Sequence, residues 1–164
     1  GASIRDAKPT MDAYMKSLLH LLHLAGVIIW VGGMFFAHFC LRPVAAAQLQ
    51  PPQRLPLLAA ILGRFFAIVA VCIIVILLSG LAIMLSTGMG NAPLHWHLML
   101  TLGLIMTGIF GIIYFRHFPK LKAAVAIQDC PAAGAAMNSI RVLVAGNLAL
   151  GATTILVAIL GAIL

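Results

Sequence analysis

The sequence predicts an all-α integral membrane protein, a four-helix bundle made of two pseudo-repeated helical hairpins. Of its 164 residues, 63% are hydrophobic and 8% are charged, and the mean hydropathy is +1.15, a composition outside the range of soluble domains. Four apolar stretches are long enough to cross the hydrocarbon of a bilayer, which takes roughly 20 residues. These predicted spans run over about 17–41, 58–85, 94–115 and 140–163.

The first span is not a cleavable signal peptide, because it lacks a small-residue cleavage site and carries histidines along its length. Residues 1–10 differ in character from the rest of the chain. Gly-Ala-Ser ahead of the Met-Asp start at Met11 resembles a remnant of a cloned fusion, which we leave out of the topology. We therefore expect residues 11–164 to form a single transmembrane domain without a soluble catalytic module.

The formal charge of +7 is explained by membrane topology rather than by nucleic-acid binding. Basic residues flank the connections that follow the first and third spans, whereas the second connection, 86–93, has none. By the positive-inside rule, the two basic connections face the cytoplasm and both termini face outward. We expect a multi-pass protein of a bacterial-type inner membrane with periplasmic termini, surrounded by lipid. The flanking residues are Arg42, Arg54, Arg64, Arg116, Lys120, Lys122 and Arg141.

The two halves of the chain repeat the same order of features about 75 residues apart, so that His20 corresponds to His95 and Arg42 to Arg116. Each half crosses the membrane twice, so both halves run in the same direction and are related by a pseudo-two-fold axis along the membrane normal. The first and third helices are then parallel. Their facing side chains meet at the centre of the bundle, which is a common location for cofactors.

Six histidines are the main candidates for function, because an imidazole inside a bilayer is unfavourable unless it has a partner. Four of them fall at the outer level of the membrane: His20, His23, His95 and His97. The other two fall at the cytoplasmic level: His38 and His117. The two levels are about 27 Å apart along a helix, so one ligand cannot bridge them. We predict an outer metal or haem site, with the second pair as the candidate for an inner site.

Helical phase limits which histidines can share the outer site. On a regular α-helix His20 and His38 share a face, and His23 lies about 60° from both. His95 and His97 are about 200° apart, so only one of them can point inward. Helical phase alone favours His20 and His95 as the two histidines that face each other across the bundle.

Haem b, in one copy or two, is the cofactor that this arrangement favours. Imidazoles supply axial ligands, and glycine-rich parallel helices can supply the dry slot that the macrocycle needs. Such a centre would transfer electrons and make the protein a candidate oxidoreductase, with quinol or another carrier as its partner. Four inner-level arginines are candidates to pair with haem propionates: Arg42, Arg64, Arg116 and Arg141.

Copper binding or copper transport is the alternative function. His20 with His23, and His95 with His97, have spacings that can chelate one ion, and methionine sulfur suits Cu(I). The methionines concerned are Met34, Met84, Met89, Met99 and Met106. Their positions in the sequence define no path of donors through the bilayer, and haem is preferred for that reason. A proton relay is not expected, because the chain has no glutamate and its aspartates lie outside the spans.

Several motifs resemble the CopD-type membrane family, which is named for copper resistance. The resemblance covers the chain from Met11 to its end, and it implies a four-span membrane protein with a link to copper. The residues that carry it are Leu19–Gly26 (LHLLHLAG), Trp30–Gly33 (WVGG) with Phe36, Leu41–Pro43 (LRP), His95–His97 (HWH) and Asn147–Gly151 (NLALG).

A related family, the HemJ-type protoporphyrinogen oxidases, has a similar four-span plan and binds haem b. In this resemblance His23 and His97 fall on the histidines of the family's first and third helices. The family carries a lysine two residues further on, where this chain has Met99, and this difference argues against protoporphyrinogen oxidation. All four outer histidines therefore stay in the predicted site. A non-catalytic membrane subunit and a homodimer remain open alternatives.

Overall fold

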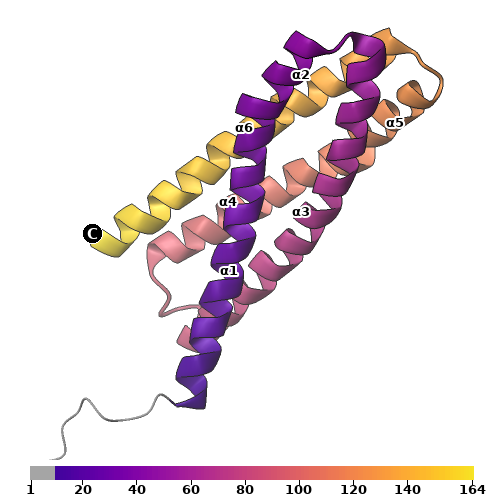
Figure 1. Ribbon diagram of the computed structural model, residues 1–164. Helices are drawn as coiled ribbons and strands as arrows, with labels where there is room; N and C mark the ends of the chain where they lie inside the picture. Colours follow the sequence, from indigo (N-terminus) through magenta and orange to yellow (C-terminus); the bar gives the residue numbers. More distant parts are fainter. Residues whose placement is uncertain (1–9) are drawn as a thin grey trace, which may run out of the picture.

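The computed structural model describes residues 10–164, and within this range the chain is helical almost throughout and contains no strand. Four helical segments are long and apolar enough to cross a membrane. Their main helices are α1 (Met11–Phe36), α3 (Pro51–Thr87), α4 (Leu94–Ile112) and α6 (Cys130–Ile163). Helices α1 and α4 run in one direction, and α3 and α6 run in the other (Figure 1). The predicted all-α membrane bundle of four helices is confirmed.

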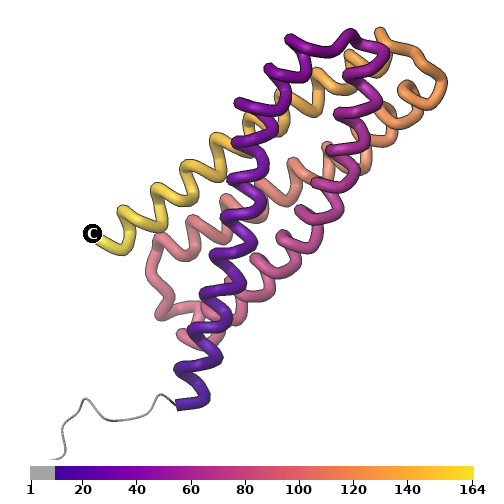
Figure 2. The backbone as a smooth tube through the Cα atoms, viewed as in Figure 1, coloured from indigo at the N-terminus to yellow at the C-terminus, as the bar shows by residue number. Residues whose placement is uncertain are grey.

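Helices α1 and α4 each continue through a widened turn into a shorter helix. The elements that follow α1 are η2 (Ala37–Leu41) and α2 (Arg42–Gln48), and those that follow α4 are η3 (Ile113–His117) and α5 (Phe118–Ala126). The connections that lead into α3 and α6 lie at the same end of the molecule (Figure 2). We call this the basic end, because it carries the arginines and lysines predicted to face the cytoplasm.

Each widened turn ends two residues before a proline, Pro43 or Pro119. In η2 the N–H of Arg42 donates to the carbonyl of Ala37, five residues back instead of four, and η3 has the same pattern. Proline has no N–H, and its ring clashes with the carbonyl four residues back in a regular helix. The wider turn gives the ring room. Its recurrence at matching positions supports the repeat of two hairpins.

The helices extend beyond the predicted spans, and the two basic connections are mostly helical. Between the first two predicted spans, which leave 42–57 as their connection, only Leu49 and Gln50 are not helical. Hydropathy reports where the lipid-soluble surface ends, whereas the helix ends only where the backbone leaves helical geometry. That happens at Leu49, which is extended, and at Gln128, which has a φ of 58°. Of residues 1–10, expected to be a cloning remnant, 1–9 lie outside the described residues, and Thr10 caps α1 through a hydrogen bond from the N–H of Ala13.

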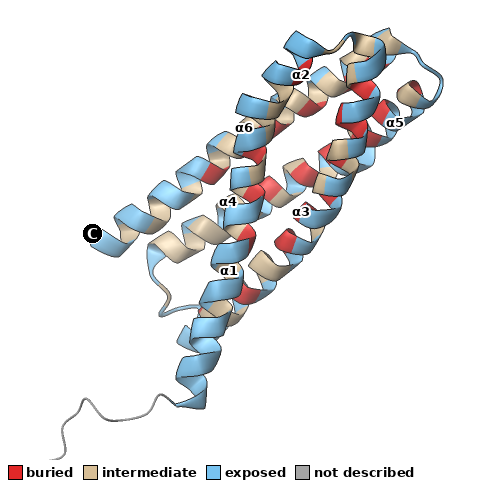
Figure 3. Cartoon of the chain, viewed as in Figure 1, coloured by how far each residue is buried: buried red, intermediate tan, exposed pale blue. Residues whose placement is uncertain are grey.

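The bundle is packed tightly near its basic end. Helix α1 packs mainly on α3, and α4 packs mainly on α6. The ring of Phe66 meets those of Phe110 and Phe118 edge-on, with centroids 5.8 and 5.2 Å apart. Buried positions follow the inward faces of the helices, and the outward faces are exposed for contact with lipid (Figure 3).

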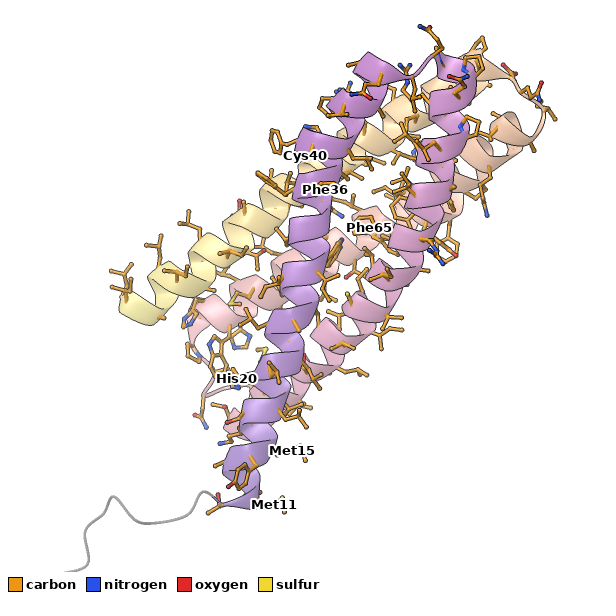
Figure 4. The ribbon with its side chains drawn as sticks, in the orientation of Figure 1. Met11, Met15, His20, Phe36, Cys40 and Phe65 are labelled. Atoms are coloured by element: carbon orange, nitrogen blue, oxygen red, sulfur yellow. The ribbon has the colours of Figure 1, made fainter. Side chains whose placement is uncertain are left out.

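Glycines allow α1 and α3 to approach closely. A Cβ atom at Gly26 would lie 2.7 Å from Cγ1 of Ile76, and one at Gly33 would overlap the ring of Phe65. Figure 4 shows Phe65 between the two helices. A Cβ at the neighbouring Gly32 would meet nothing within 4 Å. Close packing therefore depends on particular glycines and not on small residues in general.

We expect Gly33→Ala to lower the free energy of unfolding by about 1–3 kcal/mol, because the added methyl group would overpack the ring of Phe65. Gly32→Ala is the matched control. It should be neutral or stabilising by up to about 1 kcal/mol, because alanine is the better helix former. Thermal unfolding of both variants in the same detergent measures the difference. Equal stability of the two variants would contradict the close approach of α1 and α3.

Candidate functional site

A cavity of about 390 Å³ lies among the four long helices, in the half of the bundle away from the basic end. Its walls are mostly apolar and come from α1, α3, α4 and α6. Two imidazoles, two indoles and three thioethers are among the groups that line it: His20, His23, Trp30, Trp96, Met84, Met99 and Met106. The cavity therefore brings together two of the predicted histidines and three of the predicted methionines.

His23 of α1 is half-buried and is held by α3. Its Nδ1 lies 3.0 Å from the carbonyl oxygen of Ile76 and 3.1 Å from the hydroxyl oxygen of Ser79. A carbonyl oxygen can only accept a hydrogen bond, so Nδ1 of the neutral ring carries the proton. Nε2 is then unprotonated, and its lone pair is available to a metal ion.

His20, one turn earlier on α1 and labelled in Figure 4, is exposed at the mouth of the cavity. Its Nδ1 lies 2.8 Å from the carbonyl oxygen of Lys16 in its own helix. The same reasoning places the proton on Nδ1 and leaves Nε2 free. Both cavity histidines therefore have the nitrogen farther from the backbone available as a ligand.

The other two outer histidines are engaged elsewhere. His95 packs so closely on α6 that a Cβ at Gly161 would overlap its ring. His97 donates from Nε2 to the carbonyl of Met89, 3.0 Å away in the connection between α3 and α4. Trp96, which lies between them in sequence, lines the cavity instead. The rotation of α4 about its axis thus directs the indole inward, and the structure does not bring the four outer histidines together.

The predicted inner pair lies in the two widened turns, His38 in η2 and His117 in η3. A widened turn holds more residues than a regular one, so a phase counted at 3.6 residues per turn does not carry through it. The ring of His38 packs edge-on against Phe39, with centroids 4.9 Å apart. Among residues 10–164, no group of three or more His, Cys, Asp or Glu side chains is arranged to hold a metal ion. A metal site formed by residues 10–164 therefore needs methionine ligands, or fewer than three ligands from these four residue types.

The four arginines predicted to pair with propionates lie toward the basic end, beyond the cavity. Arg116 is ten residues after Met106, and Arg141 is ten residues before Gly151, which are the nearest lining residues on their helices. Ten residues correspond to about 15 Å of helix. Arg42 and Arg64 lie at least as far along their own helices from the lining residues. Their positions do not favour contact with a ligand in this cavity.

Two buried polar side chains were not among the predicted site residues, Ser79 at 3% exposed and Asn147 at 1% exposed. Asn147 of α6 donates from Nδ2 to the carbonyl of Met106, 3.1 Å away, and so joins α6 to α4 beside the cavity. Ser79 contacts His23 as described above. A single serine or asparagine within an apolar span is the signal that could have identified both, because such groups need partners in the membrane.

Comparison with protein families matches residues 59–160 to the family described as CopD, copper resistance protein D. The match covers more than half of the chain. This protein belongs to the CopD family. The predicted resemblance to this family is confirmed. Membership of the family makes the chain a membrane protein related to copper resistance. The CopD match includes Trp96, Met99 and Met106, whereas His20 and His23 precede it. No curated protein and no solved structure matches the chain.

We expect the neutral rings of His20 and His23 to be protonated at Nδ1 and that of His97 at Nε2, because these are the nitrogens that face carbonyl oxygens. Nitrogen-15 spectra of histidine-labelled protein in detergent distinguish the two neutral forms of each ring. Assignment uses the single histidine-to-glutamine variants. Protonation of His23 at Nε2 would contradict its attachment to α3.

Proposed function

We propose that this CopD-family protein binds copper as Cu(I) in the cavity among its four helices. The observation that carries the proposal is the meeting of two imidazoles, each with a free Nε2, and three thioethers on one cavity. Imidazole nitrogen and thioether sulfur are suitable ligands for Cu(I). The ligands are His20 and His23, with sulfur from Met84, Met99 or Met106. Membership of a copper-resistance family supports the choice of metal.

The charge of the cavity favours a monovalent ion. Among the described residues that line it, none is Asp or Glu. A divalent ion in mostly apolar surroundings without an anionic ligand would be strongly penalised by desolvation. Cu(I) carries a single charge and prefers soft donors. These properties favour Cu(I) over Cu(II) or zinc at this site.

The lining ligands differ in exposure in a way that supports entry of copper from the end where α1 begins. His20 is exposed, His23 is half-buried, and Met84 and Met106 are buried. An ion arriving at His20 would move from an accessible imidazole toward enclosed sulfur. The predicted topology places this end outside the cytoplasm. The aromatic core around Phe66 fills the other half of the bundle, so passage to the basic end requires a second conformation.

Haem b is the second candidate, because an apolar cavity holds His23 on α1 together with Met99 and Met106 on α4. A histidine and a methionine form one of the axial ligand pairs that haem proteins use, and haem bound there would supply one-electron transfer. The bis-histidine version has less support, since His95 and His97 do not line the cavity. Electron transfer with quinol, a relation to the HemJ-type enzymes and a homodimer all stay predictions.

We expect His20→Ala and His23→Ala each to weaken Cu(I) binding by at least about tenfold, because each removes a ligand. His117→Ala, at the opposite end of the bundle, is the matched control and should bind as the unaltered protein does. Competition with a chromogenic Cu(I) chelator under anaerobic conditions measures the affinity. An optical spectrum of the same preparation, oxidised and then dithionite-reduced, tests the alternative. The copper proposal would be overturned if the unaltered protein bound no copper and showed haem bands that disappeared in His23→Ala.

Filling the cavity should also weaken copper binding. Gly103 lines the cavity, and a Cβ there would meet nothing within 4 Å, so Gly103→Leu extends into empty space. We expect this variant to stay folded and to lose at least about tenfold in Cu(I) affinity. Gly108→Leu is the control, because Gly108 is exposed on the same helix and equally unobstructed. Unchanged copper binding by Gly103→Leu would place the metal outside this cavity.

A further inference from the structure

Ser79 is a buried hydroxyl in the apolar helix α3, and its hydrogen bonds determine what it can offer to His23. Its Oγ lies 2.6 Å from the carbonyl of Val75 and 3.2 Å from that of Ile76. A hydroxyl has one proton, and here that proton is directed at helix carbonyls. Its lone pairs remain to accept a hydrogen bond. The available donor is Nδ1–H of His23, 3.1 Å away.

The carbonyl of Ile76 cannot by itself fix the ring of His23, because it serves several donors. It belongs to the hydrogen-bonded ladder of α3 and also lies near the hydroxyl of Ser79. Nδ1 of His23 therefore shares this carbonyl and takes Ser79 as a second acceptor. Two acceptors on one rigid helix define both the plane of the ring and the nitrogen that holds the proton.

Gly80 provides the space for this arrangement. A Cβ there would lie 3.1 Å from Cε1 and 3.3 Å from Nδ1 of His23, closer than ordinary van der Waals contact. Any larger residue at this position would press on the imidazole. Consecutive positions of α3 thus hold the ring, Ser79 by accepting a hydrogen bond from its N–H and Gly80 by having no side chain.

We infer that Ser79 is a positioning residue that keeps Nε2 of His23 free and directed for copper, with Gly80 as the adjoining space. Ser79 is not among the residues that line the cavity, so it acts through His23 and not on the metal. The inference rests on the proposed copper site. Partners that hold the second nitrogen of a metal-binding histidine typically contribute 10–100-fold to metal affinity. When Ser79 is lost, the ring can rotate and place its proton on Nε2, which blocks the ligand.

The test compares Ser79→Ala with Ser86→Ala. Ser86 is also on α3 and donates to a helix carbonyl, that of Ile83 at 2.8 Å, but it is exposed and is not hydrogen-bonded to His23. We expect Ser79→Ala to weaken Cu(I) binding by about tenfold or more. In the copper-free protein its His23 should show a new population protonated at Nε2. Ser86→Ala should change neither measurement, and Ser79→Thr, which keeps the hydroxyl, should restore both.

A second variant keeps the inference testable if Ser79→Ala does not fold. Gly80→Ala should weaken copper binding by displacing the ring of His23, whereas Gly63→Ala on the same helix meets only Phe118 at an ordinary 3.4 Å and should not. Normal copper affinity in Ser79→Ala or Gly80→Ala, with loss of binding in His23→Ala, would overturn the inference and leave the copper site standing. Normal copper affinity in His23→Ala would overturn the copper site. In that case only the tautomer of His23 in copper-free Ser79→Ala would test whether Ser79 positions the ring. A single form protonated at Nδ1 would overturn the inference.

Discussion

An imidazole N–H inside hydrocarbon must find an acceptor within the protein, and in this bundle the acceptors are mainly backbone carbonyls. Nδ1 of His20 meets the carbonyl of Lys16, and Nδ1 of His23 meets that of Ile76. Which nitrogen is engaged decides which nitrogen is free to bind a ligand. The chemistry of the cavity therefore follows from which acceptor in the protein each ring N–H meets.

The interior of the bundle differs between its two halves. Near the basic end, Phe66, Phe110 and Phe118 fill the interior with interlocking rings. Away from it, α1 still approaches α3 closely at Gly26, but the space among all four helices stays open. The packed half supplies stability, and the open half leaves room for a ligand. A site of this kind does not weaken the core, because the two occupy different levels of the membrane.

The two hairpins have the same backbone plan but contribute different side chains to the cavity. Both contain a widened turn two residues ahead of a proline, so the repeat extends to local geometry. The histidines that open the first hairpin line the cavity, whereas in the second hairpin Trp96 takes that place and His95 packs against α6. The pseudo-symmetry therefore applies to the helices but not to the side chains that line the cavity. The site belongs to all four long helices, because its histidines come from α1 and its methionines from α3 and α4, and α6 completes the wall.

The four spans, the all-α bundle, the repeat and the CopD family could be predicted from the sequence, because hydropathy, charge and short motifs are local properties. The sequence also named the histidines and methionines from which a site can be built. It did not determine which of them meet. That depended on the rotation of α4, which turns Trp96 inward, and on the widened turn η3, which ends at His117 and changes its phase. Ser79 was missed for the same reason, since its contact with His23 joins residues far apart in the chain and exists only when α1 and α3 pack together.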